Sequence, residues 1–142
     1  MYRTIITIIV TGLGAGLFAP SARASEDEAV ECAAMATARF MREGYRLRNH
    51  DSDILNQGQI QDYDGVFNRG QQYVIFACGD SRAVDLDITV YNEDGDLVAR
   101  DQQTDNRPLV VIAPRWTGPF RARVSMYSAR GTAHYTMVVM TR

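Results

Sequence analysis

The sequence predicts a mostly β fold, in which antiparallel sheets follow one N-terminal helix, in a chain that is exported. Three observations carry this prediction. The chain opens with an apolar leader, continues with one stretch of helical periodicity, and then alternates apolar and polar residues in short segments as far as the C-terminus.

Residues 1–24 have the features of a secretory signal peptide. Arg3 supplies a positive charge, residues 5–19 form an apolar run, and Ala22-Arg23-Ala24 places small residues where a signal peptidase reads them. We expect cleavage before Ser25, which leaves one domain of about 118 residues. The apolar run is too short for a comfortable membrane span and no second one follows. The sequence therefore predicts a periplasmic or secreted protein with no membrane span after signal removal.

Residues 25–48 are predicted to form the N-terminal helix. Apolar residues recur at spacings of three and four between Val30 and Tyr45. Acidic residues gather near the start and arginines near the end, as the helix dipole favours. Ser25 and Glu28 have the spacing of a capping box, which predicts that the helix begins at Ser25.

The strands are expected after a polar connector. Residues 49–70 are rich in turn-forming residues and are predicted to be this connector, with one short strand near 54–60. Six strands separated by turns are then expected, at 72–78, 84–92, 97–100, 109–113, 120–127 and 134–141. Their period-two patterning is typical of antiparallel sheets with one buried and one polar face. Glu93-Asp94-Gly95-Asp96 predicts a tight hairpin turn in which Gly95 has positive φ.

Composition excludes some classes of function. The whole chain has a formal charge of −2, and two of its 15 basic residues lie in the leader, so the mature chain is more acidic still. A protein that binds nucleic acid needs a basic face, so we expect no nucleic-acid partner. Every basic residue is arginine, and the absence of lysine excludes Schiff-base chemistry.

Cys32 and Cys78 are expected to form a disulfide. An even pair of cysteines in an exported chain is most simply a bridge, which here would tie the helix to the β-rich part. Two free buried thiols are the alternative. A zinc site is disfavoured because the pair lacks the close spacing of zinc ligands.

An ordered set of motifs runs through residues 70–139. The motifs are Gly70-Gln71-Gln72-Tyr73, Asp85-Leu86-Asp87-Ile88, Tyr91-Asn92-Glu93-Asp94-Gly95, Val98-Ala99-Arg100-Asp101 and Pro114-Arg115-Trp116-Thr117-Gly118-Pro119-Phe120, before a final strand with Tyr135. In this order they resemble the bacterial pre-peptidase C-terminal (PPC-like) domain family. The resemblance implies a jelly-roll-like β-sandwich, with the connector, over residues 49–142. It also implies an accessory or binding role, since such domains are commonly appended to secreted hydrolases.

Five acidic residues are candidates for a calcium site: Asp85, Asp87, Asp94, Asp96 and Asp101. The first two share one face of a predicted strand, and the others lie around the adjacent hairpin. Clusters rich in carboxylate oxygen can bind calcium, and some relatives of the resembling fold hold this ion. The alternative is that these side chains are solvated or accept backbone hydrogen bonds at turns.

Trp116, Arg121 and Arg123 are candidate ligand contacts. The two arginines share one strand face, where they could bind a carboxylate or sulfate group of a partner. The alternative is a solvated row that pairs with acids across the strands. An exposed Trp116 would stack on a sugar or anchor a protein partner, whereas a packed one would close the sandwich edge.

The two histidines offer little catalytic machinery. His134 is expected near Ser125 and Ser128, but no nucleophile motif accompanies them. His50 lies beside Asp51 and Asp53, which makes a weak transition-metal site the alternative to an exposed loop. We therefore expect a non-enzymatic binding or structural module of unknown ligand. The alternative is a module, stabilised by calcium as a possible cofactor, that recognises a glycan or protein surface.

Overall fold

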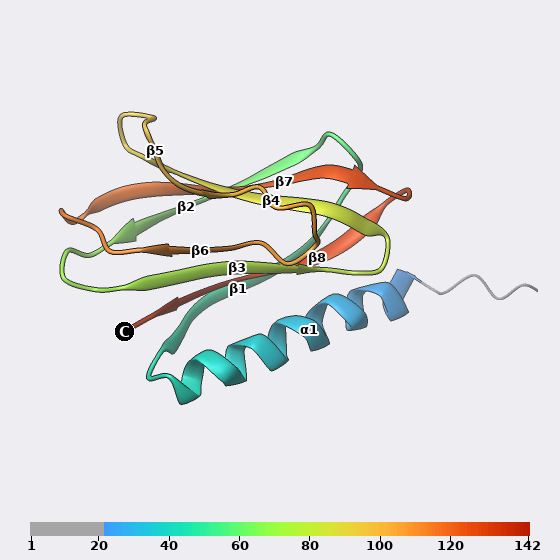
Figure 1. Cartoon of the computed structure of the whole chain (residues 1–142), viewed down its shortest axis with the longest axis horizontal. Helices are drawn as coiled ribbons and strands as arrows, with labels where there is room; N and C mark the ends of the chain where they lie inside the picture. Colours follow the sequence, from blue (N-terminus) through green and yellow to red (C-terminus); the bar gives the residue numbers. More distant parts are fainter. Residues whose placement is uncertain (1–21) are drawn as a thin grey trace, which may run out of the picture.

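A computed structural model of the chain describes residues 22–142. These residues form one helix and eight strands, arranged as two four-stranded antiparallel sheets that pack face to face (Figure 1). The mostly β fold expected from the sequence is confirmed. The predicted signal peptide, residues 1–24, lies outside the described residues except for its last three, which belong to the helix.

The helix-covered sheet has the strand order β1-β8-β3-β6, and the solvent-facing sheet has the order β2-β7-β4-β5. The strands are β1 (Arg46–Leu55), β2 (Ile60–Phe67), β3 (Tyr73–Gly79), β4 (Ala83–Asn92), β5 (Leu97–Asp101), β6 (Leu109–Ile112), β7 (Gly118–Ala129) and β8 (Ala133–Thr141). The chain crosses between the sheets at every connection except the β4–β5 hairpin. This order is that of a jelly-roll sandwich.

The core lies between the sheets and follows from the period-two patterning. Leu86, Ile88 and Val90 alternate along β4 and are fully buried, as are Tyr135 on β8 and most of its apolar neighbours. Burial of each such side chain contributes roughly 1.5–3 kcal/mol before the entropy cost of ordering. The Tyr135 hydroxyl lies 2.6 Å from that of Tyr63 on β2, so a hydrogen bond links the two sheets inside the sandwich.

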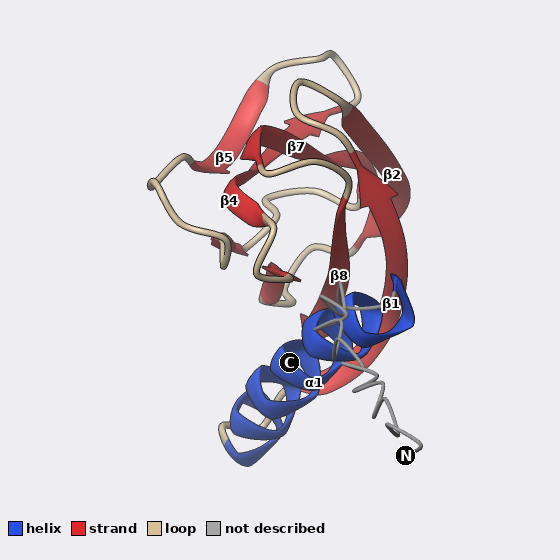
Figure 2. Cartoon of the chain, turned by 90° about the vertical axis from the view of Figure 1, so that its right-hand side faces the viewer, coloured by secondary structure: helices blue, strands red, loops and turns tan. Residues whose placement is uncertain are grey.

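The helix α1 (Ala22–Arg42) packs on the outer side of the helix-covered sheet, mainly over β8 and to a lesser extent over β3 and β1. Figure 2 shows it beside β8 and β1. Phe40 packs between the helix and the sheet, and its ring centroid lies 5.6 Å from those of both Phe76 and Tyr45. The predicted disulfide between Cys32 and Cys78 is confirmed and joins α1 to β3. Within residues 22–142, no helix combines the length and the apolar character needed to cross a bilayer.

The predicted helix boundaries, 25–48, are wrong at both ends. The helix already includes Ala22, so Ser25 lies inside it, with 4% of its surface exposed, and does not cap it. The helix ends at Arg42 because Gly44 adopts a φ of 90°, a left-handed conformation that stops a helix. The Tyr45 amide then donates to the Phe40 carbonyl at 3.0 Å, and the chain turns into β1.

The predicted connector, 49–70, contains two long strands instead of one short one. Strands β1 and β2 occupy most of it, and the segment 54–60 spans the turn between them. Each is the edge strand of its sheet, with a single neighbour, β8 or β7. Edge strands carry polar residues on both faces, so the alternation that identifies a strand in sequence is weak there.

The β4–β5 hairpin forms where the sequence predicted it. Gly95 has a φ of 81°, and the Asn92 side-chain carbonyl accepts hydrogen bonds from the amides of Asp94 at 3.0 Å and Asp96 at 2.8 Å. The hairpin rises above the solvent-facing sheet at one end of the molecule (Figure 1).

Candidate ligand-binding groove

The outer face of the solvent-facing sheet carries two opposed rows of charged side chains. On β7, Phe120 and every second residue after it face the core, so Arg121 and Arg123 face outward. The antiparallel register with β2 places Asp64 opposite Arg121 and Asp62 opposite Arg123. We call these four residues the charged ladder.

Both pairs of the charged ladder are bidentate. Arg121 donates from Nε to Asp64 Oδ1 at 2.7 Å and from Nη2 to Oδ2 at 3.0 Å. Arg123 donates to Asp62 in the same way, at 2.7 and 2.9 Å. These hydrogen bonds hold the pKa of both carboxyl groups below its ordinary value. Arg121 and Arg123 are therefore paired with acids across the strands, which is the alternative to ligand binding that the sequence analysis left open.

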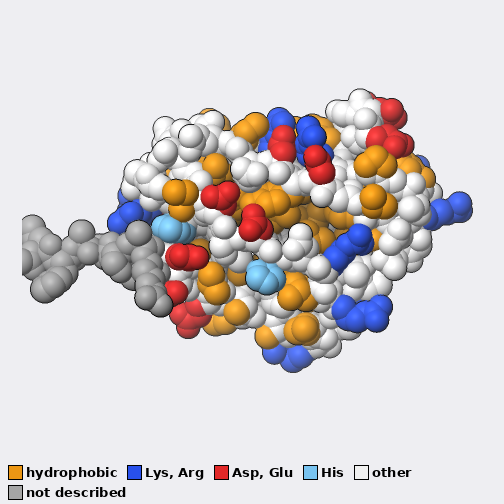
Figure 3. Space-filling view, turned by 180° about the vertical axis from the view of Figure 1, so that it is seen from behind, with side chains coloured by type: hydrophobic (Ala, Val, Ile, Leu, Met, Phe, Trp, Pro, Cys, Tyr) orange, Lys and Arg blue, Asp and Glu red, His pale blue; other side chains and the backbone are white. Residues whose placement is uncertain are grey.

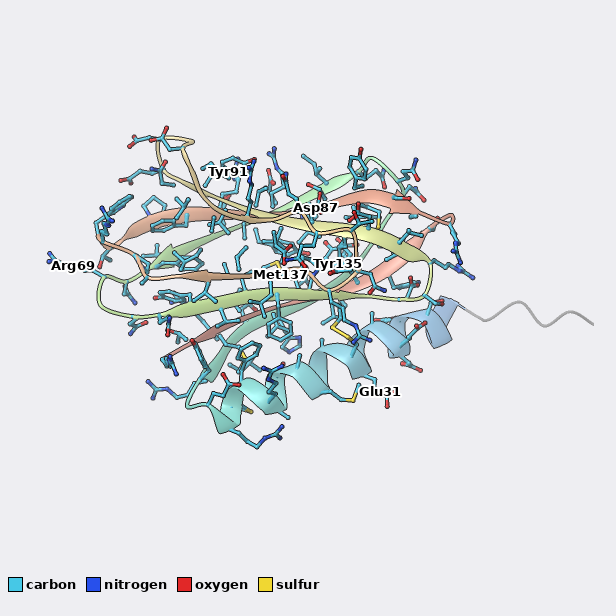
Figure 4. The ribbon with its side chains drawn as sticks, in the orientation of Figure 1. Glu31, Arg69, Asp87, Tyr91, Tyr135 and Met137 are labelled. Atoms are coloured by element: carbon cyan, nitrogen blue, oxygen red, sulfur yellow. A yellow bond between two sulfur atoms is a disulfide. The ribbon has the colours of Figure 1, made fainter. Side chains whose placement is uncertain are left out.

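A groove of about 620 Å³ lies between the charged ladder and the β4–β5 hairpin. It is lined by Asp64, Tyr91, Asn92, Glu93, Gly95, Pro119, Phe120, Arg121 and Arg123. Tyr91 and Asp87, two outward positions of β4, lie on the outer side of the solvent-facing sheet (Figure 4). The Arg123 guanidinium carbon is 5.6 Å from the centre of the Tyr91 ring, within the range of a cation–π contact. An aromatic ring and a row of paired charges thus share one open groove.

The charge balance of this groove does not favour an anion. Among the lining residues, two arginines face two carboxylates, Asp64 and Glu93, and Arg123 is also paired with Asp62 beside the groove, so no positive charge is left in excess. A ligand carboxylate or sulfate would have to displace Asp62 or Asp64 from a bidentate guanidinium edge. The guanidinium groups keep unused N–H donors, and the carboxylates keep unused lone pairs. Such a mixture of donors and acceptors suits a neutral ligand with many hydroxyl groups.

Trp116 lies at the end of the sandwich and mainly packs. Its ring stacks on Phe120 with centroids 5.7 Å apart, and Phe120 stacks in turn on Phe67 at 5.3 Å. A Cβ at Gly118 would come within 3.2 Å of Trp116 Cδ1, so this glycine leaves room for the indole. The indole is still 39% exposed. It is not among the groove-lining residues, but Glu93, which lines the groove, approaches the same glycine.

The structure does not bring the five predicted calcium ligands together. Asp101 pairs beside Ile88 on β4 and so lies close to Asp87. Asp94 and Asp96 instead lie at the hairpin tip, where their amides bond to Asn92. Five residues of extended strand separate Asp87 from the hairpin, a span of about 16 Å. Across residues 22–142, no group of three or more histidine, cysteine, aspartate or glutamate side chains is arranged to hold a metal ion.

Asp85 and Asp87 nevertheless lie in an unusual environment. The Oδ1 atoms of both residues and the hydroxyl of Thr89 are buried without a hydrogen-bond partner. Burial raises the pKa of both carboxyl groups. Asp105 raises the pKa of both further, and Asp85 and Asp101 add to the rise at Asp87. Asp105 comes from the β5–β6 loop, and its carbonyl accepts the Leu86 amide at 2.8 Å. The outer face of β4 therefore has acceptor oxygens in excess of donors.

Sequence reasoning missed the two acids of the charged ladder and the groove residue Tyr91. Asp62 and Asp64 show the period-two spacing of a strand face, but they fell in the predicted connector. Opposite charges at matching period-two positions, here an Arg-x-Arg and an Asp-x-Asp segment, are the signal that would have paired them.

The two histidines lie on neighbouring strands of the helix-covered sheet. His134 is on β8 of the helix-covered sheet, whereas Ser125 and Ser128 are on β7 of the other sheet. His50 lines a groove beside α1 together with Val138, its partner across β1 and β8. Successive residues of a strand face opposite ways, so Asp51 lies on the other face of β1 from His50. The His50 metal site considered from the sequence is not assembled.

Comparison with known proteins gives no family. No protein-family model matches the chain, and no curated protein matches it. Among solved structures, the chain is similar to a de novo designed double-stranded β-helix determined by solution NMR, with 14% sequence identity and a TM-score of 0.36. The match covers 65% of this chain and 99% of that chain. The resemblance to PPC-like domains stays a prediction.

Proposed function

We propose that the mature chain is an exported, non-enzymatic binding module that recognises a neutral glycan in the groove beside the charged ladder. One observation carries the proposal: an outward tyrosine ring, Tyr91, shares an open groove with Arg121 and Arg123, whose charges are each neutralised by an aspartate of β2. A binding role also agrees with the role that the PPC-like resemblance implies.

The chemistry of a sugar ring matches both features of the groove. Its C–H face is apolar and stacks on an aromatic ring, while its hydroxyl groups donate and accept hydrogen bonds at the ring edge. Arg121 and Asp64 offer donors and acceptors side by side without a large net charge. The groove volume of about 620 Å³ is within the usual range for small-molecule sites.

Export is supported by two features that are independent of the groove. The leader has the composition of a signal peptide, and Cys32 and Cys78 are joined. Disulfides persist in oxidising compartments outside the cytosol. Together they favour the periplasm or the extracellular space as the site of function.

A calcium-stabilised form of the same module is the second candidate. The observation that favours it is the pair of buried, unpartnered Oδ1 atoms on Asp85 and Asp87. Because no complete metal-binding group of side chains is present within residues 22–142, such an ion would have to take several ligands from backbone carbonyls and water.

Calorimetric titration with a panel of neutral and anionic oligosaccharides tests the glycan proposal. We expect neutral glycans to bind, and Tyr91→Ala to weaken binding at least about tenfold through loss of the stacking surface. Tyr127→Ala is the matched control, because this tyrosine is on β7 of the same sheet and 71% exposed but does not line the groove. The proposal is wrong if no neutral glycan binds, or if the two variants lose affinity equally.

A further inference from the structure

A second groove runs along α1 on the opposite side of the molecule from the charged ladder. The helix lies mainly over β8 and contacts β3 and the edge strand β1 to a similar, smaller extent. A groove of about 290 Å³ remains between the helix and strands β1 and β8. Its walls are mostly apolar: Val30, Ala33, Ala34, Thr37, Ala38, Met41, Leu47, His50, Thr136 and Val138. Figure 3, seen from behind, shows exposed hydrophobic side chains among polar ones on this side of the molecule.

The rim of this groove exposes large apolar side chains to water. Val30 is 42% exposed, Met41 53% and Leu47 43%. Along α1, Val30, Ala34 and Met41 recur at helical spacing and form one continuous stripe beside the groove. A contiguous apolar stripe rimmed by charges marks an interaction surface more often than a scattered apolar residue does.

The charges beside the stripe change sign along the helix. After the expected cleavage site, which removes Arg23, the first half of the helix carries Glu26, Asp27, Glu28 and Glu31. Its last turn carries Arg39 and Arg42. Glu31 points away from the sheet that α1 covers (Figure 4). Within residues 25–142, none of Asp27, Glu31 and Arg42 takes part in an ion pair.

We propose that the occupant of this groove is a second copy of the same chain, whose α1 packs antiparallel to the first across a two-fold axis. In an antiparallel pair, the acidic first half of each helix lies beside the basic last turn of the other, so Asp27 faces Arg42 of the second copy. Val30 then meets Met41 of the second copy, and the short Ala34 side chain lets the helices approach near the axis. A two-fold axis makes both contacts twice.

The charge pattern selects this occupant over others. A parallel pair of helices would place like charges together at both ends, which is unfavourable. An anionic lipid surface would be repelled by the acidic half, and an uncharged apolar ligand would use neither end. Because only one helix face and its margin are shared, the interface is small, and we expect a dissociation constant in the micromolar range.

Sedimentation velocity on the exported chain, from about 1 to about 200 μM, tests the proposal in the range where a weak dimer would form. We expect a monomer–dimer equilibrium that Ala34→Glu shifts to monomer, since the added carboxylates meet near the axis. Val111→Glu is the matched control: this residue is 49% exposed and lies on β6, at the opposite edge of the helix-covered sheet from the groove. A chain that stays monomeric over the whole range would overturn the proposal, as would equal effects of the two substitutions.

A charge swap tests the antiparallel arrangement without disturbing the apolar stripe. Asp27→Arg and Arg42→Asp alone place like charges in contact, so each is expected to weaken the dimer by about tenfold. The double variant restores the opposite charges with the sides exchanged and is expected to regain most of the affinity. If the double variant loses as much dimerisation free energy as the two single variants together, the pairing of Asp27 with Arg42 of the second copy is wrong.

Discussion

Replacing Asp85 with asparagine is expected to raise the stability of the fold at neutral pH. Asp85 is 7% exposed, and its Oδ1 is buried without a hydrogen-bond partner. Burial is the main cause of its raised pKa, and Asp105 adds repulsion. Asparagine has nearly the same shape and removes the charge that burial and repulsion oppose.

The expected gain is about 1 kcal/mol at pH 7. A buried acceptor without a partner costs about 1–3 kcal/mol, and asparagine recovers part of this because a neutral amide is cheaper to bury than a carboxylate. For a domain of about 118 residues, 1 kcal/mol corresponds to a rise in melting temperature of about 4 °C.

The gain should depend on pH in a defined direction. Because the pKa of Asp85 is raised in the folded state, protonation stabilises the wild-type fold. That stabilisation is complete below the ordinary value of 3.8 and is lost as pH rises through the raised pKa. The advantage of Asp85→Asn is therefore largest at pH 7 and shrinks toward zero near pH 3.8.

Thermal unfolding followed by circular dichroism, at several pH values and with calcium or a chelator, is the assay. Asp94→Asn at the exposed hairpin tip is the control and is expected to change stability by less than about 0.5 kcal/mol. A variant that is less stable than wild type at pH 7 in chelator, or a gain that does not vary with pH, would refute the reasoning. If calcium stabilises the wild type and Asp85→Asn removes that effect, the calcium-stabilised candidate replaces the metal-free one.

Three further variants test the fold. Replacing Cys32 and Cys78 together by serine opens a bridge between positions 46 residues apart and should cost about 4 kcal/mol; an unchanged denaturation midpoint under oxidising conditions would contradict this. Tyr63→Phe leaves the buried Tyr135 hydroxyl without its partner and should cost about 1.5 kcal/mol in urea unfolding. Burial raises the pKa of Tyr63 to about 12. The neutral phenol therefore stabilises the wild-type fold fully below pH 10, and this stabilisation is lost as pH rises toward 12. If Tyr63→Phe loses as much stability as the wild type between pH 10 and 12, this reasoning is wrong. Gly95→Ala forces a side chain into a φ of 81° and should cost about 1 kcal/mol; no loss in melting temperature would mean that the hairpin adopts another turn.

The central strands could be predicted from the sequence because each has one buried and one polar face. The alternation of Leu86, Ile88 and Val90 with polar residues locates β4 directly. Edge strand β1 could not be located in this way, because Asp51 and Asp53 point toward the inner side at its open edge and break the apolar pattern. Inward-facing charges of this kind protect a free strand edge from pairing with another chain.

The groove was predictable only in part. The arginine row was visible because Arg121 and Arg123 alternate with core residues on one strand. Their partners were not, because Asp62 and Asp64 are 57 or more residues away in sequence and only the register of β2 against β7 brings them together. Likewise, closeness in sequence suggested that Asp87 and Asp94 would share a site, and the extended geometry of β4 separates them.

The glycan-binding groove is tested most directly by a two-dimensional NMR titration of the ¹⁵N-labelled chain with a neutral oligosaccharide that binds it in calorimetry. The account predicts saturable shifts concentrated at Tyr91, Asn92, Arg121 and Arg123, with α1 unaffected. Shifts confined to α1 or to the outer face of the helix-covered sheet, or no saturable shifts anywhere, would contradict it.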